Sequence, residues 1–313
     1  MMKILITGAN GFVGKSTSTE LLLQGKTVRS AVRAKAALNN NVETTIVGEI
    51  NGVTDWSQSL VGIKTVVHLA ARVHVMQDKS ADPLAEFRAV NVDGTLNLAR
   101  QAAAVGIKRF IFLSTIKVNG ELTLPNQPFT PDTANPLDAY GISKHEAEIG
   151  LRKIASETGM QVVIIRPPLV YGAGVKANFA SLLSMVKRGL PLPFGLVTNN
   201  RRSFLALDNL VDLIITCINH PNAANQTFLA SDNEDVSTTV LLRKMALAEG
   251  IPSRLLPVPV AFLNVCAKLI GKQDMAQRLL GNLQVDISHT QKVLDWQPTL
   301  SLDEGLRRAF NNA

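Results

Sequence analysis

A short apolar strand that runs directly into a glycine-rich turn constrains this fold more than any other feature. Residues Lys3–Thr7 (KILIT) lead into Thr7–Gly14 (TGANGFVG), and a helical pattern follows over Val13–Gln24. Glycines at this spacing suit a tight turn, a close backbone approach to a pyrophosphate and close packing of helix on strand. The free N–H groups at the helix start then face the anion. The sequence therefore predicts a dinucleotide site built from Gly8, Asn10, Gly11, Phe12, Val13 and Gly14.

The same alternation of short β-branched runs and helical spacing continues through the first half of the chain. Further strands are expected at Thr27–Val32, Thr65–Leu69, Arg109–Leu113 and Val162–Ile165, and further helices at Pro83–Ala104 and Ala139–Thr158. Such alternation is typical of βαβ units. The predicted class is α/β, with a doubly wound parallel sheet of the Rossmann type.

The pattern loosens after Pro167-Pro168, where prolines and short mixed elements predict a smaller, irregular lobe. We expect residues 1–170 to form the dinucleotide-binding domain and residues 171–313 to form mostly a substrate-binding lobe. One stretch, Gln226–Ala230 (QTFLA), has the pattern of a strand and is expected to return to the sheet.

Composition narrows the function classes. Hydrophobic residues make up 46% and charged residues 18%, and 32 basic against 25 acidic side chains give a net charge of +7. This mild surplus suits nucleotide or phosphate ligands, but without a basic run it does not indicate a nucleic-acid binder. The cysteines, Cys217 and Cys266, form no CxxC, and the five histidines show no metal-ligand spacing, so no metal is predicted.

No apolar run is long enough to span a bilayer, and glycines interrupt the N-terminal apolar run too early for a signal peptide. A cytoplasmic protein is therefore expected. The apolar stretch Leu255–Gly271 has two interpretations: packing within the second lobe, which we favour, or contact with a membrane surface or a lipid-linked sugar.

The end of the second strand bears on the choice between NAD and NADP. Where an acidic residue would hold the ribose 2′-OH, the sequence has Val32, and Arg33 follows directly. A missing carboxylate and a neighbouring arginine favour NADP over NAD. Glu49 and Ile50, at the end of the third apolar run, are expected near the adenine.

Three residues predict proton-transfer chemistry. Thr115 follows the fourth expected strand, and Tyr140 and Lys144 lie at i and i+4 of a helix, on one face. A lysine ammonium beside a phenol is expected to lower the pKa of that phenol. Such a tyrosine exchanges a proton with a carbinol oxygen while hydride moves to or from nicotinamide, and Thr115 holds the same oxygen.

With these residues in place, the chain resembles the extended short-chain dehydrogenase/reductase superfamily, the group of nucleotide-sugar epimerases, dehydratases and reductases. The motifs that carry the resemblance are TGxxGxxG at Thr7–Gly14, HxAA at His68–Ala71, NVxGTxN at Asn91–Asn97, the Thr115, Tyr140 and Lys144 triad, RxxxVYG at Arg166–Gly172 and an LGWxP-like segment at Leu294–Pro298. The resemblance implies cofactor contacts from Leu69, Ala70, Ala71, Asn91 and Pro167, besides Tyr140 and Lys144. It implies substrate contacts from Thr115, Asn178, Arg202 and Arg278.

Departures from the family pattern narrow the activity. Ile116-Lys117 replaces the Asp-Glu pair of the sugar 4,6-dehydratases, which excludes that chemistry. The resemblance then implies oxidoreduction at C4 of a nucleotide-linked sugar. We expect the nucleotide to be UDP and the pathway to be polysaccharide or O-antigen (lipopolysaccharide) biosynthesis. Because of Arg33 we favour a 4-keto-sugar reductase using NADPH. The alternatives are a UDP-sugar 4-epimerase with tightly held NAD and a reductase of a non-sugar carbonyl.

Two further expectations concern helices. Pro83–Ala104 and Ala139–Thr158 resemble the pair that forms a four-helix dimer interface in many relatives, so a homodimer is expected. Glu146 and Glu148, which follow the start of the second helix, are interpreted as part of a solvated face.

Overall fold

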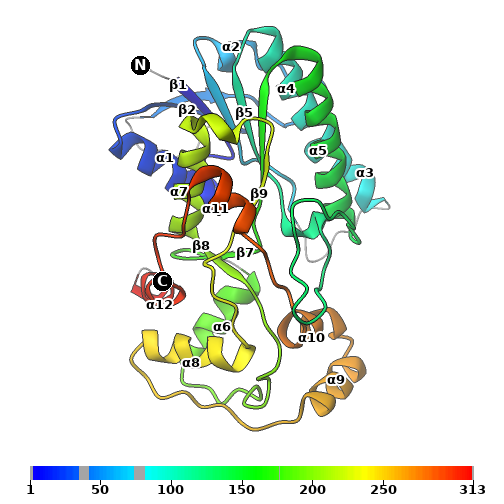
Figure 1. The fold of residues 1–313 in the computed structure, drawn as a ribbon, viewed down its shortest axis with the longest axis vertical. Helices are drawn as coiled ribbons and strands as arrows, with labels where there is room; N and C mark the ends of the chain where they lie inside the picture. The colour runs from blue at the N-terminus through cyan, green and yellow to red at the C-terminus, as the bar shows by residue number, and fades with distance from the viewer. Residues whose placement is uncertain (1–2, 35–41, 74–81, 176, 312–313) are drawn as a thin grey trace.

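A parallel sheet of seven strands forms the centre of the structure (Figure 1). The computed structural model describes residues 3–34, 42–73, 82–175 and 177–311. The strands are β1 (Lys3–Thr7), β2 (Thr27–Val32), β3 (Glu43–Ile46), β4 (Thr65–His68), β5 (Arg109–Leu113), β6 (Gln161–Arg166) and β9 (Thr227–Leu229). Their order is β3-β2-β1-β4-β5-β6-β9, and every neighbouring pair is parallel. This is the Rossmann strand order with one strand added, so the predicted α/β class is confirmed.

The central strands are buried on both faces, which explains their continuous apolar sequences. Ile4, Leu5 and Ile6 of β1 have no exposed surface. Ile4 and Ile6 pack on one side, and Leu5 packs on the other. The strict alternation of side chains along a strand therefore supplies two separate cores from one short run.

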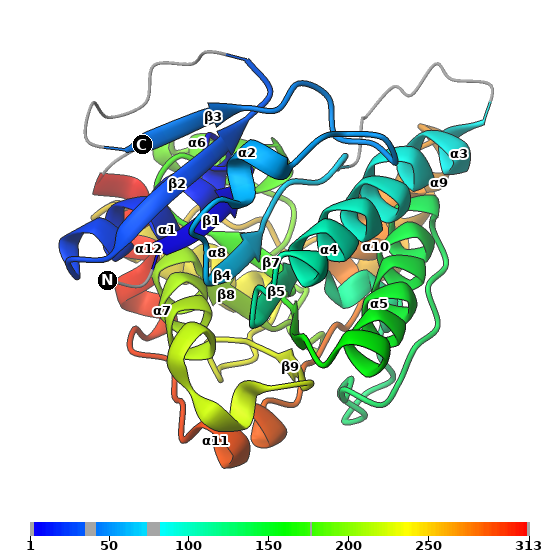
Figure 2. The same cartoon turned by 90° about the horizontal axis from the view of Figure 1, so that it is seen from above.

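Helices cover both faces of this sheet (Figure 2). One face carries α1 (Phe12–Leu23) and α7 (Leu207–Asn219), which pack against each other. The other carries α2 (Ser57–Leu60), α4 (Thr95–Ala104) and α5 (Ala139–Thr158). Helix α3 (Pro83–Arg88) packs against α5. A π-helical turn over Ala89–Gly94 joins α3 to α4, so the helix predicted over Pro83–Ala104 is continuous but not uniform.

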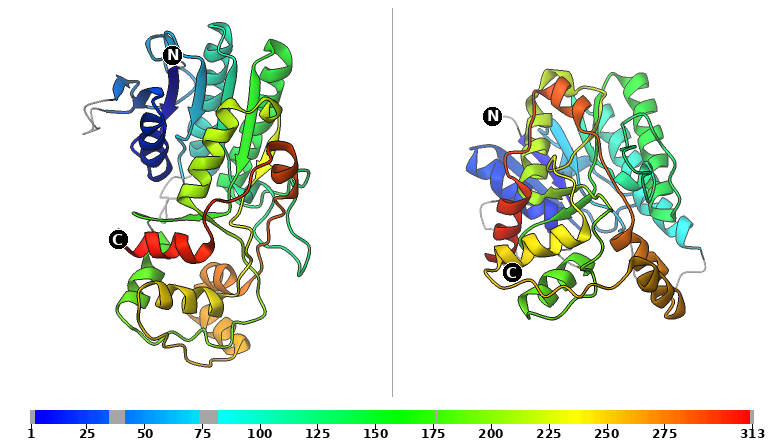
Figure 3. Two further views of the ribbon diagram at one scale, coloured as in Figure 1. Left: turned by 60° about the vertical axis from the view of Figure 1, so that its left-hand side comes forward. Right: turned by 60° about the horizontal axis from the view of Figure 1, so that its bottom comes forward.

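A second lobe lies beyond the carboxyl ends of the strands (Figures 1 and 3). It contains a two-stranded parallel sheet of β7 (Leu169–Tyr171) and β8 (Phe204–Ala206). Around this sheet pack α6 (Ala177–Lys187), α8 (Thr238–Ala248) and α12 (Leu302–Asn311), with a core of their own. In open α/β sheets ligands bind outside the carboxyl ends of the strands, so a ligand site is expected between the two lobes.

The chain passes between the two lobes more than once. After β8 it returns to the large sheet through α7 and β9, and β9 pairs with β6. It returns again with α11 (Ser288–Leu294), which packs against β9. Residues 171–313 therefore supply elements to both lobes. Of the elements that return to the large sheet, the sequence pattern indicated only the strand β9.

Helices α9 (Val260–Leu269) and α10 (Gln273–Leu280) form a pair at the outer end of the second lobe. Of the ten residues of α9, Ala267 alone is fully buried. The interpretation of Leu255–Gly271 as a packed segment is therefore wrong for most of α9, because Phe262, Val265 and Leu269 are exposed, whereas Leu263 is half-buried. No helix in the described ranges has the length and apolar character needed to cross a membrane.

Candidate functional site

The turn after β1 is too crowded for any residue but glycine at two positions. Gly8 has a φ of +68°, and a Cβ there would lie 2.7 Å from the backbone nitrogen of Ala70. A Cβ on Gly14 would lie 2.1 Å from the carbonyl oxygen of Gly8. Helix α1 thus starts in contact with the turn itself, and the backbone forms a cradle that side chains would fill.

The start of α1 offers backbone donors to a ligand. Gly11 is the N-cap and brings no side chain to satisfy the first N–H groups of the helix. Asn10 and Gly11 are exposed, whereas Phe12 and Val13 are half-buried. Because a helix N-terminus also carries a partial positive charge, this cradle fits a diphosphate.

The predicted NADP determinant, Arg33, is exposed in the part of the chain that the structure describes. Val32 ends β2 and is buried, while Arg33 lies just beyond it and is exposed to solvent. Glu49 is exposed as well, and Ile50 is buried against Gly94. A solvated arginine is compatible with either dinucleotide, so Arg33 does not decide between them.

The end of β4 is fixed by a buried histidine. His68 hydrogen-bonds through Nδ1 to Thr7 Oγ1 at 2.7 Å and through Nε2 to Thr95 Oγ1 at 2.9 Å. Burial, with a smaller effect of Lys144, lowers the pKa of His68 to about 3, so the imidazole is neutral. Thr7 Oγ1 also accepts from the Ala70 N–H. The half-buried segment Leu69, Ala70 and Ala71 is thereby held against the glycine turn.

Asn91 holds the next part of that segment. Its Oδ1 accepts from the Arg72 N–H at 2.8 Å, and its Nδ2 donates to the Arg72 carbonyl and to Ser143 Oγ, both at 3.0 Å. The side chain is 1% exposed. The Asn91 side chain therefore links the loop after β4 to α5.

The turn after Thr115 and the start of α5 are pressed together. Asp138 caps α5, accepting from the Gly141 N–H at 2.7 Å, and its other oxygen pairs with Lys117. A Cβ on Gly141 would lie 2.8 Å from the carbonyl oxygen of Lys117. The close contact brings Tyr140, which precedes Gly141, beside the turn that begins at Thr115.

Pro167 meets this turn from the far side, because its carbonyl accepts from the Ile116 N–H at 2.9 Å. Sequence analysis placed Thr115, Tyr140 and Pro167 in one site but missed the contacts of Lys117, Asp138 and Gly141. The Asp two residues before Tyr140 is a recognisable N-cap signal that pointed to this contact.

The expected sign of the tyrosine pKa shift is wrong for the protein alone. Burial, together with the charge of Asp138, raises the pKa of Tyr140. Burial lowers the pKa of Lys144 to about 7, although Glu148 acts in the opposite direction. The Lys144 ammonium lies 4.0 Å above the ring centroid of Phe112, a cation–π contact that offsets part of the burial cost. Both groups therefore carry pKa values far from their ordinary ones, which is characteristic of functional sites.

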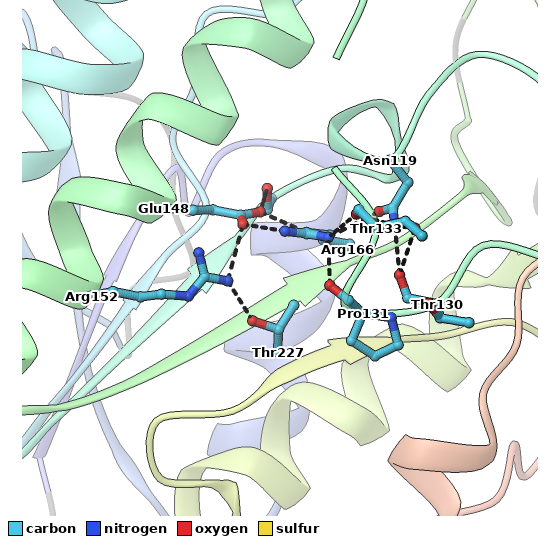
Figure 4. A network of polar contacts seen from close by, with 9 residues as sticks. Asn119, Thr130, Pro131, Thr133, Glu148, Arg152, Arg166 and Thr227 are labelled. Atoms are coloured by element: carbon cyan, nitrogen blue, oxygen red, sulfur yellow. Dashed lines mark hydrogen bonds and ion pairs between the residues drawn. The ribbon is translucent and has the colours of Figure 1, made fainter. Parts of the chain in front are cut away.

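Behind these residues lies a buried ionic network (Figure 4). Arg166 donates to Glu148 from Nε at 2.9 Å and from Nη2 at 2.6 Å, and Ser114 Oγ donates to the same carboxylate at 2.6 Å. Arg152 adds a contact of 3.3 Å from its exposed side. Glu148 has no exposed surface, so its interpretation as part of a solvated face is wrong. Glu146 is more accessible and pairs with Arg88.

The same guanidinium also holds the loop that leads to α5. Arg166 Nη1 donates to Asn119 Oδ1 at 3.2 Å and to the carbonyls of Pro131 and Thr133 at 3.1 Å. The network thus ties β6, α5, the end of β5 and this loop together next to Thr115 and Lys144. Spacing held one clue to it, because Glu148 is four residues after Lys144 and shares its helix face.

The predicted substrate arginines lie near each other across the second lobe. Arg202 is half-buried, and burial together with the charge of Arg278 lowers its pKa to about 10. Arg202 Nη1 donates to the Gly281 carbonyl at 3.2 Å. Arg278, on α10, is exposed. Asn178 lies in α6, but its side chain is outside the described part of the structure.

The charge of Arg278 acts on Arg202, and two such positive charges together favour the binding of an anion. No group of three or more His, Cys, Asp or Glu side chains within the described ranges is arranged to hold a metal ion.

Comparison with known proteins agrees with this arrangement. A model of the NAD dependent epimerase/dehydratase family matches residues 4–230. A UDP-glucose 4-epimerase of Vibrio cholerae is 52% identical over 307 residues, which cover 97% of this chain and 93% of that protein. An N-acetyl-alpha-D-glucosaminyl-diphospho-ditrans,octacis-undecaprenol 4-epimerase of Escherichia coli O157:H7 is 27% identical and covers 86% of this chain and 81% of that protein.

Solved structures share the fold over the whole chain. A UDP-N-acetylglucosamine 4-epimerase from Bacillus cereus superposes with a TM-score of 0.81 at 18% identity, covering 98% of this chain and 97% of that one. A UDP-glucuronic acid 4-epimerase from Bacillus cereus in complex with NAD gives 0.79 at 22% identity, covering 99% and 96%.

Proposed function

The chain belongs to the NAD dependent epimerase/dehydratase family, and we propose that it is a 4-epimerase of a UDP-linked sugar that works with bound NAD. The observation that carries the proposal is the 52% identity to the Vibrio cholerae UDP-glucose 4-epimerase over nearly the full length of both chains. UDP-glucose is accordingly the first substrate to test.

The glycine turn is the proposed cofactor site. Gly8, Gly11 and Gly14 leave a cradle at the start of α1, and its backbone donors suit the pyrophosphate of NAD. Leu69 to Ala71, braced by Thr7 and Asn91, and Pro167 line the proposed path of the nicotinamide half. When bound, NAD accepts a hydride from the sugar and later returns it.

Thr115 and Tyr140 act on the sugar in this proposal. Thr115 hydrogen-bonds the 4-oxygen and fixes its position, and Tyr140 removes the hydroxyl proton as hydride leaves C4. The sugar, now a ketone at C4, turns its other face, and the proton and hydride return to give the epimer. No net oxidation takes place, so the cofactor stays bound through every turnover.

Lys144 supplies positive charge beside Tyr140. Burial and the charge of Asp138 raise the pKa of the phenol, so the proton is removed only when cationic groups favour the phenolate. Lys144 has a pKa of about 7 and lies on the same helix face as Tyr140. In our proposal the Lys144 ammonium provides this charge, and bound NAD would add the positive charge of its nicotinamide ring.

The epimerase takes the place of the 4-keto-sugar reductase predicted from Arg33. What supports this choice is the relative at 52% identity, a UDP-glucose 4-epimerase. NAD is proposed over NADP because the matching family model is described as NAD dependent and a neighbour of the same fold binds NAD.

Arg202 and Arg278 are the proposed anchors of the diphosphate of the substrate. A guanidinium donates two parallel hydrogen bonds to phosphate oxygens, and a dianionic group between the two arginines relieves their repulsion. Asn178, at the start of α6, is proposed as a further contact.

The proposal is tested by incubating the purified protein with UDP-glucose and, separately, with UDP-N-acetylglucosamine, without added dinucleotide. The 4-epimer is expected to accumulate to an equilibrium mixture, and heat denaturation is expected to release NAD. Oxidation of NADPH at 340 nm that requires a 4-keto sugar or another carbonyl substrate, with no epimer formed, would contradict the proposal.

We further propose a cytoplasmic homodimer in the assembly of bacterial surface polysaccharides. In the dimer α4 and α5 of each copy meet in a four-helix interface. Ile149 of α5, 55% exposed, is the test residue: Ile149→Arg is expected to convert a dimeric mass in light scattering into a monomeric one. A monomer in the unchanged protein at micromolar concentration rejects the dimer.

A further inference from the structure

Helix α9 turns its large apolar side chains to the outside. Phe262, Val265 and Leu269 are 60%, 56% and 80% exposed, and Ile270, at the end of the helix, is 68% exposed. The spacing i, i+3 and i+7 places the first three on one face. We call these four residues the α9 stripe.

Other residues of α9 are covered: Ala267 is buried, and Leu263 and Cys266 are half-buried. Val260, Asn264, Ala267 and Lys268 line an open groove of about 490 Å³, whose other wall is α10. No member of the α9 stripe lines that groove. Helix α9 therefore covers only part of its apolar surface, whereas an ordinary surface helix turns its large apolar side chains inward.

Positive charge borders the α9 stripe. Lys268 directly precedes Leu269, and Lys272 follows Ile270 by two residues; both are exposed. Between residues 260 and 280 these lysines and Arg278 stand against a single acidic residue, Asp274. An apolar face bordered by lysines is complementary to a surface that is apolar within and anionic at its rim.

The charge around the α9 stripe distinguishes between two partners that could cover it, a second copy of the chain and a lipid surface. A second copy docked through the same face would bring the lysines of both chains together and repel. An anionic lipid headgroup layer instead pairs with the lysines, while Phe262 and Leu269 enter the acyl boundary.

We propose that α9 is an interfacial anchor that lies in the plane of an anionic bilayer. The pair α9 and α10 lies at the edge of the second lobe in Figure 1 and in the right view of Figure 3 (orange to brown), and the stripe on α9 is exposed. Because α10 also carries Arg278, an anchored protein holds the mouth of its diphosphate site near the headgroups. This inference goes beyond the proposed activity and does not depend on it.

The test is sedimentation with vesicles of phosphatidylglycerol and phosphatidylethanolamine, compared with vesicles of phosphatidylcholine alone. The full chain is expected to sediment with the anionic vesicles and to remain largely free with the neutral ones. The double variants Phe262→Ser with Leu269→Ser, and Lys268→Glu with Lys272→Glu, are each expected to weaken vesicle binding roughly tenfold or more. The matched control is Leu247→Ser on α8, which removes a leucine that is 77% exposed but lies outside the stripe.

Three results would overturn the proposal. The first is no vesicle binding by the unchanged chain. The second is equal weakening by Leu247→Ser, which would mark nonspecific adsorption. The third is a dimer mass in light scattering that the Phe262→Ser and Leu269→Ser variant reduces to a monomer, because the stripe would then be covered by a second copy. Melting temperature and turnover of a water-soluble sugar nucleotide show that each variant is folded.

Discussion

Arg166 and Glu148 face each other in the interior, joined by hydrogen bonds of 2.9 Å and 2.6 Å, and water reaches neither side chain. Burial opposes ionisation of Glu148, but the hydrogen bonds and charge of Arg166, with the bond from Ser114, prevail and lower its pKa. The pair lies behind the site, where it holds the Ser114 end of β5 and the loop that leads to α5.

Replacing Glu148 by Gln is expected to destabilise the protein by about 3–5 kcal/mol, because it leaves a buried guanidinium without its counter-charge. Urea unfolding at neutral pH measures the loss. The matched control is Glu146→Gln, whose pair with Arg88 is partly exposed and contributes about 1 kcal/mol or less. Equal losses for the two variants would show that the buried pair has no special role.

The same pair predicts how stability depends on pH. A carboxyl whose folded pKa is lowered stabilises the fold above its ordinary pKa and loses that contribution as pH falls through the folded pKa. The difference in unfolding free energy between the unchanged protein and Glu148→Gln is therefore expected to shrink below about pH 4.5. A difference that stays constant into acid would contradict this assignment of charge.

The buried charge of Lys144 is expected to lower the free energy of unfolding. Its pKa is lowered to about 7, so the unfolded chain binds more protons between about pH 7 and 10.5, and burying the ammonium costs most at pH 7 and below. Lys144→Met keeps the volume and removes the charge. We expect this variant to be more stable at pH 7, to lose that advantage towards pH 10.5, and to be inactive. Lys153→Met, on the exposed side of the same helix, is the control and should change neither property. A less stable Lys144→Met at pH 7 would refute the burial argument.

Gly14→Ala tests the cofactor cradle. The added Cβ would lie 2.1 Å from the Gly8 carbonyl oxygen, so α1 must move away from the turn. We expect loss of copurifying dinucleotide, measured by absorbance after denaturation, together with a lower melting temperature. Gly52→Ala, whose Cβ would meet an ordinary contact of 3.4 Å, should leave both unchanged. Retention of cofactor by Gly14→Ala would mean that the dinucleotide binds elsewhere.

Arg202→Met is expected to raise KM for the UDP-sugar roughly tenfold to a hundredfold, because a charge-assisted hydrogen bond to phosphate contributes about 1.5–3 kcal/mol. kcat should change little, since the guanidinium binds a part of the substrate that does not react. Arg201→Met, which removes an exposed neighbour with backbone contacts, is the comparison. A fall in kcat with unchanged KM would place Arg202 at the reacting sugar instead.

The residues that local pattern could identify were predicted well. β1, β2 and β5 have the bounds expected from the sequence. In β1 and β5 the apolar run is unbroken between the end residues, as a strand buried on both faces requires. The glycine turn could also be predicted, because the spacing of its glycines follows from backbone geometry. The preference for NAD or NADP could not be predicted, since an arginine at position 33 is equally compatible with a phosphate pocket and with solvent.

Errors arose where a partner comes from far along the chain. Glu148 was assigned to solvent because the residue that pairs with it, Arg166, lies on another element. The pKa of Tyr140 was predicted with the wrong sign because the i+4 lysine is visible in the sequence, whereas burial is not. For α9, apolar composition suggested packing, and only the position of α10 reveals which face has a partner.

The most direct test of the epimerase assignment is proton NMR of the reaction in D₂O with UDP-glucose and no added dinucleotide. If the hydrogen of C4 leaves as hydride and returns to the same carbon, the 4-epimer must form with protium at C4, and Tyr140→Phe must abolish the conversion. Deuterium at C4 of the product, or no product until NADPH and a 4-keto sugar are supplied, would contradict the account.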